Sequence, residues 1–111
     1  MENQEKLKNQ NISSHAWSNP ASPQYRALDW LSNDDNFQTD NLPIDRVVQR
    51  YSLATFYYAL DGENWDNDFH FLTNVSECLW NDNTYGVFCS KDSNEISKIW
   101  IGKFEKKKCI S

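Results

Sequence analysis

The stretch SECLWNDNTYGVFCS, residues 76–90, contains two of the three cysteines of the chain. Cys78 lies near its beginning, Cys89 near its end, and Trp80 follows the first cysteine by two residues. Such a pair is compatible with a disulfide, with half of a metal site, with a reactive thiol pair or with two buried free thiols. Other features of the sequence are needed to choose among these hypotheses, because each predicts a different structure around the two cysteines.

The composition describes an acidic chain of one domain's length that is rich in aromatic residues. The 111 residues carry a net charge of −5, and 14% of them are aromatic, including five tryptophans. Nucleic acid and anionic membranes require a basic surface, so neither is predicted as a partner, and the short basic run 106–108 does not reverse this. No apolar run reaches the roughly 18 residues of a membrane span. The polar start, MENQEKLKNQNISS, shows no signal peptide.

Local patterns divide the chain into three parts. Residues 1–20 are rich in Asn, Gln, Lys and Ser, and they are predicted to form a disordered polar leader. Residues 21–103 carry the folded domain. Residues 104–111 are predicted to be a basic tail, because they continue no pattern.

Two helices are predicted in the first half of the domain. The first has Ser22 as N-cap and Pro23 at the first helical position, and it ends near Asn33. Its apolar face consists of Tyr25, Ala27, Leu28, Trp30 and Leu31. The second spans residues 44–60, with Gly62 as its stop signal. The stripe that it is expected to bury consists of Val47, Tyr51, Ala54, Thr55 and Tyr58.

The second half of the domain predicts a loop and a hairpin. Residues 64–83 have no clear period and are expected to form an ordered loop with a turn or two. Residues 84–90 and 95–101 are strand-like, and the second run shows the cleaner alternation. The intervening KDSN, residues 91–94, has the composition of a turn.

The order of these features resembles the N-terminal capping domain of plant-type leucine-rich repeat proteins. In that family an apolar helix is followed by a tryptophan, the motif C-x-W-x-G-V-x-C, and a first strand of the form V-x-x-L-x-L. The matching residues here are Leu53, Tyr57, Leu60, Trp65, Cys78, Trp80, Gly86, Val87, Cys89, Ile96, Ile99 and Ile101. The preceding helix, SPQYRALDWL, resembles the extended cap of diatom-type members. The resemblance covers residues 21–101.

The resemblance implies an α+β fold, in which two helices pack on a small disulfide-stapled β-hairpin. The disulfide would join Cys78 and Cys89, with Trp80 packed against it, and would stabilise the fold by up to about 3 kcal/mol. A zinc site would instead need His70 and Cys109 at irregular spacing, and no Cys-x-x-Cys redox motif is present.

The chain departs from the family pattern in two places. The interval between Trp80 and Gly86 is longer than in plant members, which implies a small insertion, and the pattern ends beyond the hairpin. Phe104 stands where the repeat has an asparagine, and Lys106 stands at an apolar position. The chain is therefore expected to be an isolated cap, truncated before the repeats. Without a following repeat, strand 96–101 is expected to have one unpaired edge and to leave Ile99, Trp100 and Ile101 at least partly exposed. The isolated chain is therefore expected to self-associate through this edge.

By resemblance, the expected function is that of a non-catalytic cap that shields the first edge of a leucine-rich solenoid. Missing downstream repeats would bind a protein or an extracellular ligand, outside the cell or at its surface. No cofactor is expected. Two alternatives stay open: a small independent exported protein that binds a partner through its acidic aromatic loop, and, less favoured, a fragment of a metal-dependent enzyme.

Other candidate residues have more ordinary explanations. The acids Asp61, Glu63, Asp66 and Asp68 lack the spacing of a calcium-binding hand, so they are expected to be solvated. Neither histidine has a convincing nucleophile beside it, and no catalytic site is predicted. The aromatic set Trp65, Phe69, Phe71 and Trp80 is expected in the core rather than in an exposed patch.

Two triplets match the acceptor pattern for N-glycosylation. They begin at Asn11 (NIS) and at Asn74 (NVS). They have meaning only if the chain enters the secretory pathway, and Asn74, four residues before Cys78, is the better placed of the two.

Overall fold

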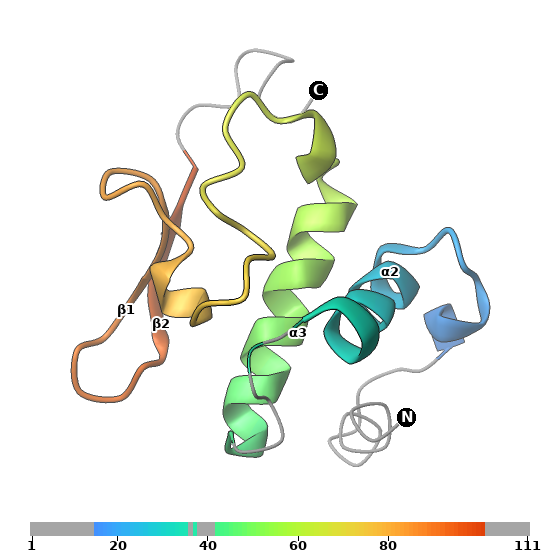
Figure 1. Ribbon diagram of the computed structural model, residues 1–111, viewed down its shortest axis with the longest axis horizontal. Coiled ribbons are helices and arrows are strands. Elements are labelled where there is room, and N and C mark those ends of the chain that lie inside the picture. The colour runs from blue at the N-terminus through green and yellow to red at the C-terminus, as the bar shows by residue number, and fades with distance from the viewer. Residues whose placement is uncertain (1–14, 36, 38–41, 102–111) are drawn as a thin grey trace.

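The computed structural model describes residues 15–35, 37 and 42–101. Helix α3 (Ile44–Ala59) is central, with helix α2 (Pro23–Asp29) on one side and the hairpin of β1 (Gly86–Cys89) and β2 (Ile96–Trp100) on the other (Figure 1). The segment that follows α3 runs between this helix and the hairpin (Figure 1). It includes two short helical turns, η4 (Gly62–Asn64) and η5 (Glu77–Leu79). The predicted α+β class, with two helices, a hairpin and one disulfide, is confirmed.

Helix α2 begins as predicted. Ser22 is its N-cap, and the Ser22 hydroxyl accepts the N–H of Tyr25 at 3.0 Å. The helix passes into one wider turn, η2 (Trp30–Asp34), which the Asp35 N–H closes by donating to the Trp30 carbonyl at 2.9 Å. Of the predicted apolar face, Ala27, Leu28, Trp30 and Leu31 are buried. The prediction was wrong for Tyr25, which is 36% exposed.

The fold begins earlier than the sequence predicted. Residues His15–Ser18 form a short helical turn, η1, so the predicted disordered leader is corrected from residue 15 onward. Trp17 is buried, and its indole N–H donates to the Tyr51 hydroxyl of α3 at 2.9 Å. This buried hydrogen bond attaches η1 to the core. Residues 1–14 lie outside the described residues.

Helix α3 agrees with the predicted span of 44–60 to within one residue, but its buried face is rotated. Val47, Tyr51 and Ala54 are buried as predicted, whereas Thr55 and Tyr58 are only half-buried. The Tyr58 ring lies at the surface beneath the guanidinium of Arg26, 4.3 Å from ring centre to charge. The other buried residues of the helix are Arg50, Leu53 and Tyr57.

The end of α3 also differs from the prediction. Asp61, and not Gly62, adopts the left-handed conformation, with φ of 59°, which Asp tolerates better than most residues. Gly62 has a different role, since a Cβ atom there would overlap the Tyr57 ring. The glycine therefore permits the close packing of η4 on α3.

The hairpin is antiparallel. Gly86 pairs with Trp100 and Val87 with Ile99, and an irregularity lies between Phe88 and Cys89. The connecting turn and both predicted strands are confirmed.

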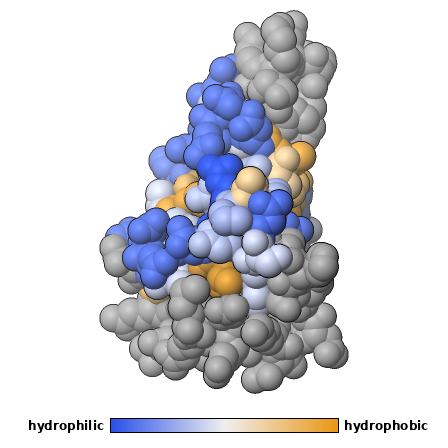
Figure 2. All heavy atoms as spheres, turned by 90° about the vertical axis from the view of Figure 1, so that its right-hand side faces the viewer, coloured by the Kyte–Doolittle hydropathy of each residue, from blue (hydrophilic) through white to orange (hydrophobic). Residues whose placement is uncertain are grey.

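Apolar side chains gather between these elements. The aromatic set of the loop is buried, as predicted: Trp65, Phe69, Phe71 and Trp80. Seen from the α2 side, the described surface is largely hydrophilic, with small hydrophobic areas (Figure 2).

Candidate functional site

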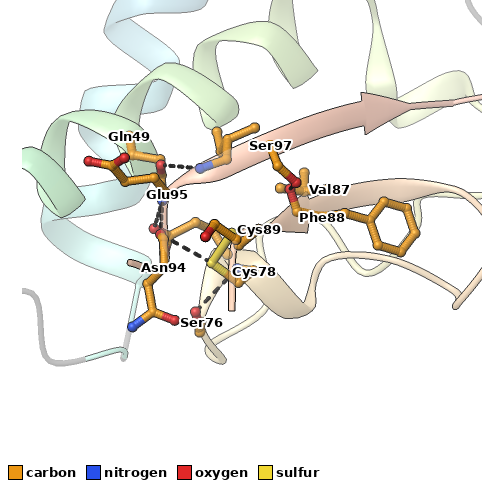
Figure 3. Close-up of a disulfide and its surroundings, with 12 residues drawn as sticks. Gln49, Ser76, Cys78, Val87, Phe88, Cys89, Asn94, Glu95 and Ser97 are labelled. Carbon is orange, nitrogen blue, oxygen red and sulfur yellow. Dashed lines mark hydrogen bonds between the residues drawn. A yellow bond between two sulfur atoms is a disulfide. The ribbon is translucent and has the colours of Figure 1, made fainter. Parts of the chain in front are cut away.

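The predicted disulfide is confirmed. The sulfur atoms of Cys78 and Cys89 are 2.05 Å apart and their Cα atoms are 5.4 Å apart. Cys78 belongs to η5 and Cys89 ends β1, so the bond ties the loop to the hairpin (Figure 3). Ser76 caps η5 by accepting the Cys78 N–H at 3.2 Å. The Asn94 carbonyl oxygen of the hairpin turn lies 3.4 Å from the Cys78 sulfur.

Trp80, Gly86 and Val87, the central residues of the motif, form one packed unit. Trp80 and Val87 are fully buried, and the Trp80 carbonyl accepts the Val87 N–H at 2.8 Å. Gly86 has φ of 123°, and a Cβ atom there would overlap the Trp80 carbonyl oxygen. Only glycine suits this approach, since other residues rarely adopt that conformation. The Trp80 ring packs against Trp30 and Phe71, with centroids at 5.8 and 5.4 Å.

Trp65, the remaining tryptophan of the motif, closes the opposite end of the loop. Its indole N–H donates to the Leu60 carbonyl at 2.9 Å, at the end of α3. Its ring packs edge-on against Tyr57 and Phe71, with centroids at 5.4 and 5.6 Å.

A buried ionic cluster, which we call the Arg50 cluster, lies beneath the loop. The guanidinium of Arg50 donates to both carboxylate oxygens of Asp35, at 2.6 and 2.7 Å. It also donates to the carbonyls of Thr73 and Val75, at 2.9 and 2.8 Å, and to Glu77 at 3.3 Å. Arg50 and Glu77 are both fully buried. The rings around the guanidinium are those of Trp30, Phe37 and Trp80.

Glu77 connects this cluster to helix α3. Its carboxylate accepts hydrogen bonds from Arg46 at 2.9 Å and from Gln49 at 2.6 Å. Burial alone would raise the pKa of Glu77, but the hydrogen bonds from Arg46 and Gln49 outweigh it and hold the pKa below its ordinary value. Glu77 is therefore an ionised buried carboxylate at neutral pH.

Gln49 carries the connection onward to β2. Its side-chain oxygen accepts the Ile96 N–H at 2.9 Å, and its amide nitrogen donates to the Asn94 carbonyl at 3.1 Å (Figure 3). The start of β2 is thereby attached to α3 through one side chain.

The rest of β2 has a free edge within the part of the chain that the structure describes, where β2 pairs with β1 alone. Val87 donates its N–H to Trp80, on the side away from β2, so the Val87–Ile99 pair is a non-hydrogen-bonded pair. In an antiparallel ladder the backbone groups of such a pair point outward. The N–H and carbonyl of Ile99 therefore face the outer edge.

The side chains of β2 are mostly exposed. Ile99 is 40% exposed and Trp100 is 48% exposed, as expected. The expectation was wrong for Ile101, which is only 6% exposed. Ile101 follows Ile99 on the strand face that pairs with buried Val87, so it reaches the core.

The other face of the hairpin carries three rings and one charge, of which Trp100 and Lys98 are exposed while Tyr85 and Phe88 are half-buried. Trp100 packs edge-on against Tyr85, with ring centroids 5.1 Å apart. The Lys98 ammonium lies 5.1 Å from the ring centres of both Phe88 and Trp100.

The remaining candidates do not gather into a site. Glu63, Asp66 and Asp68 are exposed and Asp61 is half-exposed. His70 and Asn74 are also exposed. In residues 15–35, 37 and 42–101, no three His, Cys, Asp or Glu side chains are grouped so as to hold a metal ion. No helix in these ranges is both long and apolar enough to cross a membrane. Asn11, Phe104, Lys106 and Cys109 lie outside the described residues.

Sequence reasoning missed the Arg50 cluster. Its one signal was the position of Arg50, three residues after Val47 and four before Ala54, on the apolar face of α3. Glu77 gave no such signal, because it lies in an aperiodic loop beside a cysteine.

No protein-family model, curated protein or solved structure matches the chain.

Proposed function

We propose that the chain is the N-terminal capping module of a leucine-rich repeat protein and has no catalytic role. The cap shields the first edge of the solenoid, and the downstream repeats bind a protein or another extracellular ligand. The protein acts at the cell surface or outside the cell. The observation that carries the proposal is the outward-facing backbone of Ile99 on a strand whose other edge pairs with β1.

The difference between the two strands of the hairpin supports this role. A cap must present a stable apolar end to its own core and an open strand to the next repeat. Strand β1 is attached to the core through Val87 and Cys89, whereas β2 leaves Ile99 and Trp100 exposed. Exposed strand edges pair readily with another strand.

The structure of the motif is a second support. Each motif residue has a separate physical role, since Cys78 and Cys89 close the loop, Gly86 allows the approach to Trp80, and Val87 fills the core. These roles are interdependent, which is why their order along the chain makes the resemblance to the family motif informative.

The alternative, a small independent binding protein, would need the aromatic residues of the acidic loop to be exposed. The aromatic rings of the acidic loop are buried and form part of the core. That loop therefore offers exposed carboxylates but no aromatic platform.

A fusion experiment tests the proposal. A leucine-rich solenoid that has lost its own N-terminal cap would receive the full chain, with the first repeat appended after Ser111. A second fusion would carry residues 1–101 only, with the first repeat directly after Ile101. We expect the junction after Ile101 to raise the melting temperature and the soluble yield of the solenoid. The matched control carries Ile99→Pro, which removes the outward N–H. Equal melting with and without the chain in both fusions would contradict the capping role.

A further inference from the structure

Asn74 begins an N-x-S triplet that the capping role does not use. Its side chain is exposed and, among the residues that the structure describes, makes no hydrogen bond. Its neighbour Val75 is 39% exposed. An asparagine of this triplet on a surface loop is the acceptor for N-linked oligosaccharide in exported proteins.

The backbone on both sides of Asn74 is held to the core. The carbonyls of Thr73 and Val75 accept hydrogen bonds from buried Arg50, at 2.9 and 2.8 Å. The Asn74 side chain remains exposed between these two anchored residues. A bulky group on its amide would therefore extend into solvent and displace no core contact.

The third residue of the triplet is Ser76, and its hydroxyl accepts hydrogen bonds in the folded chain. The Ser76 hydroxyl accepts the Cys78 N–H at 3.2 Å and a guanidinium N–H of Arg46 at 3.1 Å. A glycosyltransferase that recognises the triplet must reach this hydroxyl. It must therefore act before η5 forms, and the disulfide holds η5 in place because Cys78 lies in this turn and is bonded to Cys89 of β1.

We propose that Asn74 is N-glycosylated, and that the glycan is attached before the Cys78–Cys89 disulfide closes. The proposal rests on the extracellular location proposed above. The finished glycan stands beside exposed Val75 and keeps this side of the loop soluble.

The reaction takes a lipid-linked diphospho-oligosaccharide as the second substrate. The Asn74 Nδ2 atom forms a bond to the anomeric carbon of the first sugar, and the bond from that carbon to the diphosphate oxygen breaks. The lipid diphosphate leaves with the electron pair. One amide proton passes to a base of the transferase.

Expression in eukaryotic cells, with a cleavable secretory signal placed before the full chain, tests the site. The readout is a mass increment removed by peptide N-glycosidase, which converts the modified asparagine to aspartate and so locates it by mass spectrometry. We expect Asn74→Gln to abolish the increment at this site, and Asn11→Gln to leave it in place. A chain that has lost its signal, and has therefore entered the secretory pathway, but carries an unmodified Asn74 would overturn the proposal. This readout is independent of the solenoid fusion, so failure of the cap function would not alter it.

A second experiment tests the order of events. Purified unglycosylated chain, either oxidised and folded or reduced and unfolded, would be incubated with oligosaccharyltransferase and a lipid-linked donor. We expect modification of Asn74 in the unfolded chain only. Equal modification of the folded chain would overturn the inference that attachment comes first.

Discussion

The two strands of the hairpin are neighbours in the sheet but differ in how they are attached to the molecule. In β1, Gly86 and Val87 are buried, Cys89 is in the disulfide, and the Asn81 side chain donates to the Val87 carbonyl at 2.8 Å. In β2, every residue after Ile96 is exposed. The strand β1 is therefore part of the core, whereas β2 is attached through β1 and through its two ends.

This difference has a physical consequence. An isolated two-stranded hairpin is marginal in water, so the stability of this one must come from β1 and the loop beneath it. The backbone of β2 can then remain open at one edge without loss of the fold. Removing contacts on the β1 side should cost much more stability than removing them on the β2 side, and the following predictions test that contrast.

The largest expected contrast is between two tryptophans. Trp80 is fully buried beneath β1, and Trp100 on β2 is 48% exposed. Trp80→Ala should lower the free energy of unfolding by about 3–5 kcal/mol, because it opens a large cavity. Trp100→Ala should lower it by about 1 kcal/mol or less. Denaturant unfolding of both variants measures the difference, and equal losses would show that β2 is as much part of the core as β1.

The disulfide should give the next largest effect. Replacing both Cys78 and Cys89 by alanine should lower the free energy of unfolding by about 3 kcal/mol, because the unfolded chain regains the entropy of the open loop. The matched change on the other strand, Ser97→Ala, removes an exposed hydroxyl that donates to the Phe88 carbonyl at 3.1 Å. It should cost about 0.5 kcal/mol. Thermal melting of both variants provides the comparison, and a double alanine variant as stable as the parent would contradict the role of the disulfide.

The ionised state of Glu77 makes stability depend on pH. Glu77→Gln should lower the free energy of unfolding by about 2 kcal/mol at pH 7, because Arg46 and Arg50 lose a charged acceptor. Since the folded pKa of Glu77 lies below its ordinary value of 4.5, its contribution is present above pH 4.5 and is lost as the pH falls through the lower folded value.

Unfolding measured at pH 7 and at decreasing pH below 4.5 tests this dependence. The difference in free energy of unfolding between the parent and Glu77→Gln should be largest at pH 7 and should decrease as the pH falls. Glu63→Gln is the control, because Glu63 forms an exposed ion pair with Arg26 and should have little effect at either pH. If this difference in free energy of unfolding instead increased as the pH falls, Glu77 would be protonated in the folded protein.

The smallest effect on stability is expected for a substitution at the outer edge of β2. The same substitution should change the self-association of the chain. Ile99→Pro removes the outward N–H and no hydrogen bond to β1, so it should cost about 1 kcal/mol or less. The parent should elute progressively earlier in size-exclusion chromatography as its concentration rises, because the edge of β2 pairs with another copy. Ile99→Pro should elute at a constant volume, and Ile99→Val should behave as the parent does. A parent that stays monomeric at high concentration would show that this edge is already covered.

The sequence predicted those parts of the fold that have a strong local signal. The helical period around Val47, the alternation from Ile96 to Ile101 and the spacing of Trp80 from Cys78 all belong to single segments. The pairing of Cys78 with Cys89 was predicted from the resemblance to a family motif, and that motif lies within one short segment of the chain.

The parts that could not be predicted depend on contacts between distant segments. Tyr57 and Tyr58 have the same hydrophobicity, and only the positions of Phe71 and Arg26 decide which ring is buried. Arg50 becomes a core residue because Asp35 and Glu77, from two separate loops, neutralise it. No local pattern contains that information.

The backbone amide of Ile99 shows most sharply whether β2 presents an open edge to a following repeat. Amide hydrogen exchange of Ile99 would be measured in the full chain alone, at a concentration low enough to keep it monomeric, and in the solenoid fusion joined after Ile101. We expect rapid exchange in the chain alone and strong protection in the fusion, where the next strand accepts this N–H. Protection in the isolated monomer, or rapid exchange in the fusion, would mean that the edge of β2 does not receive the next repeat.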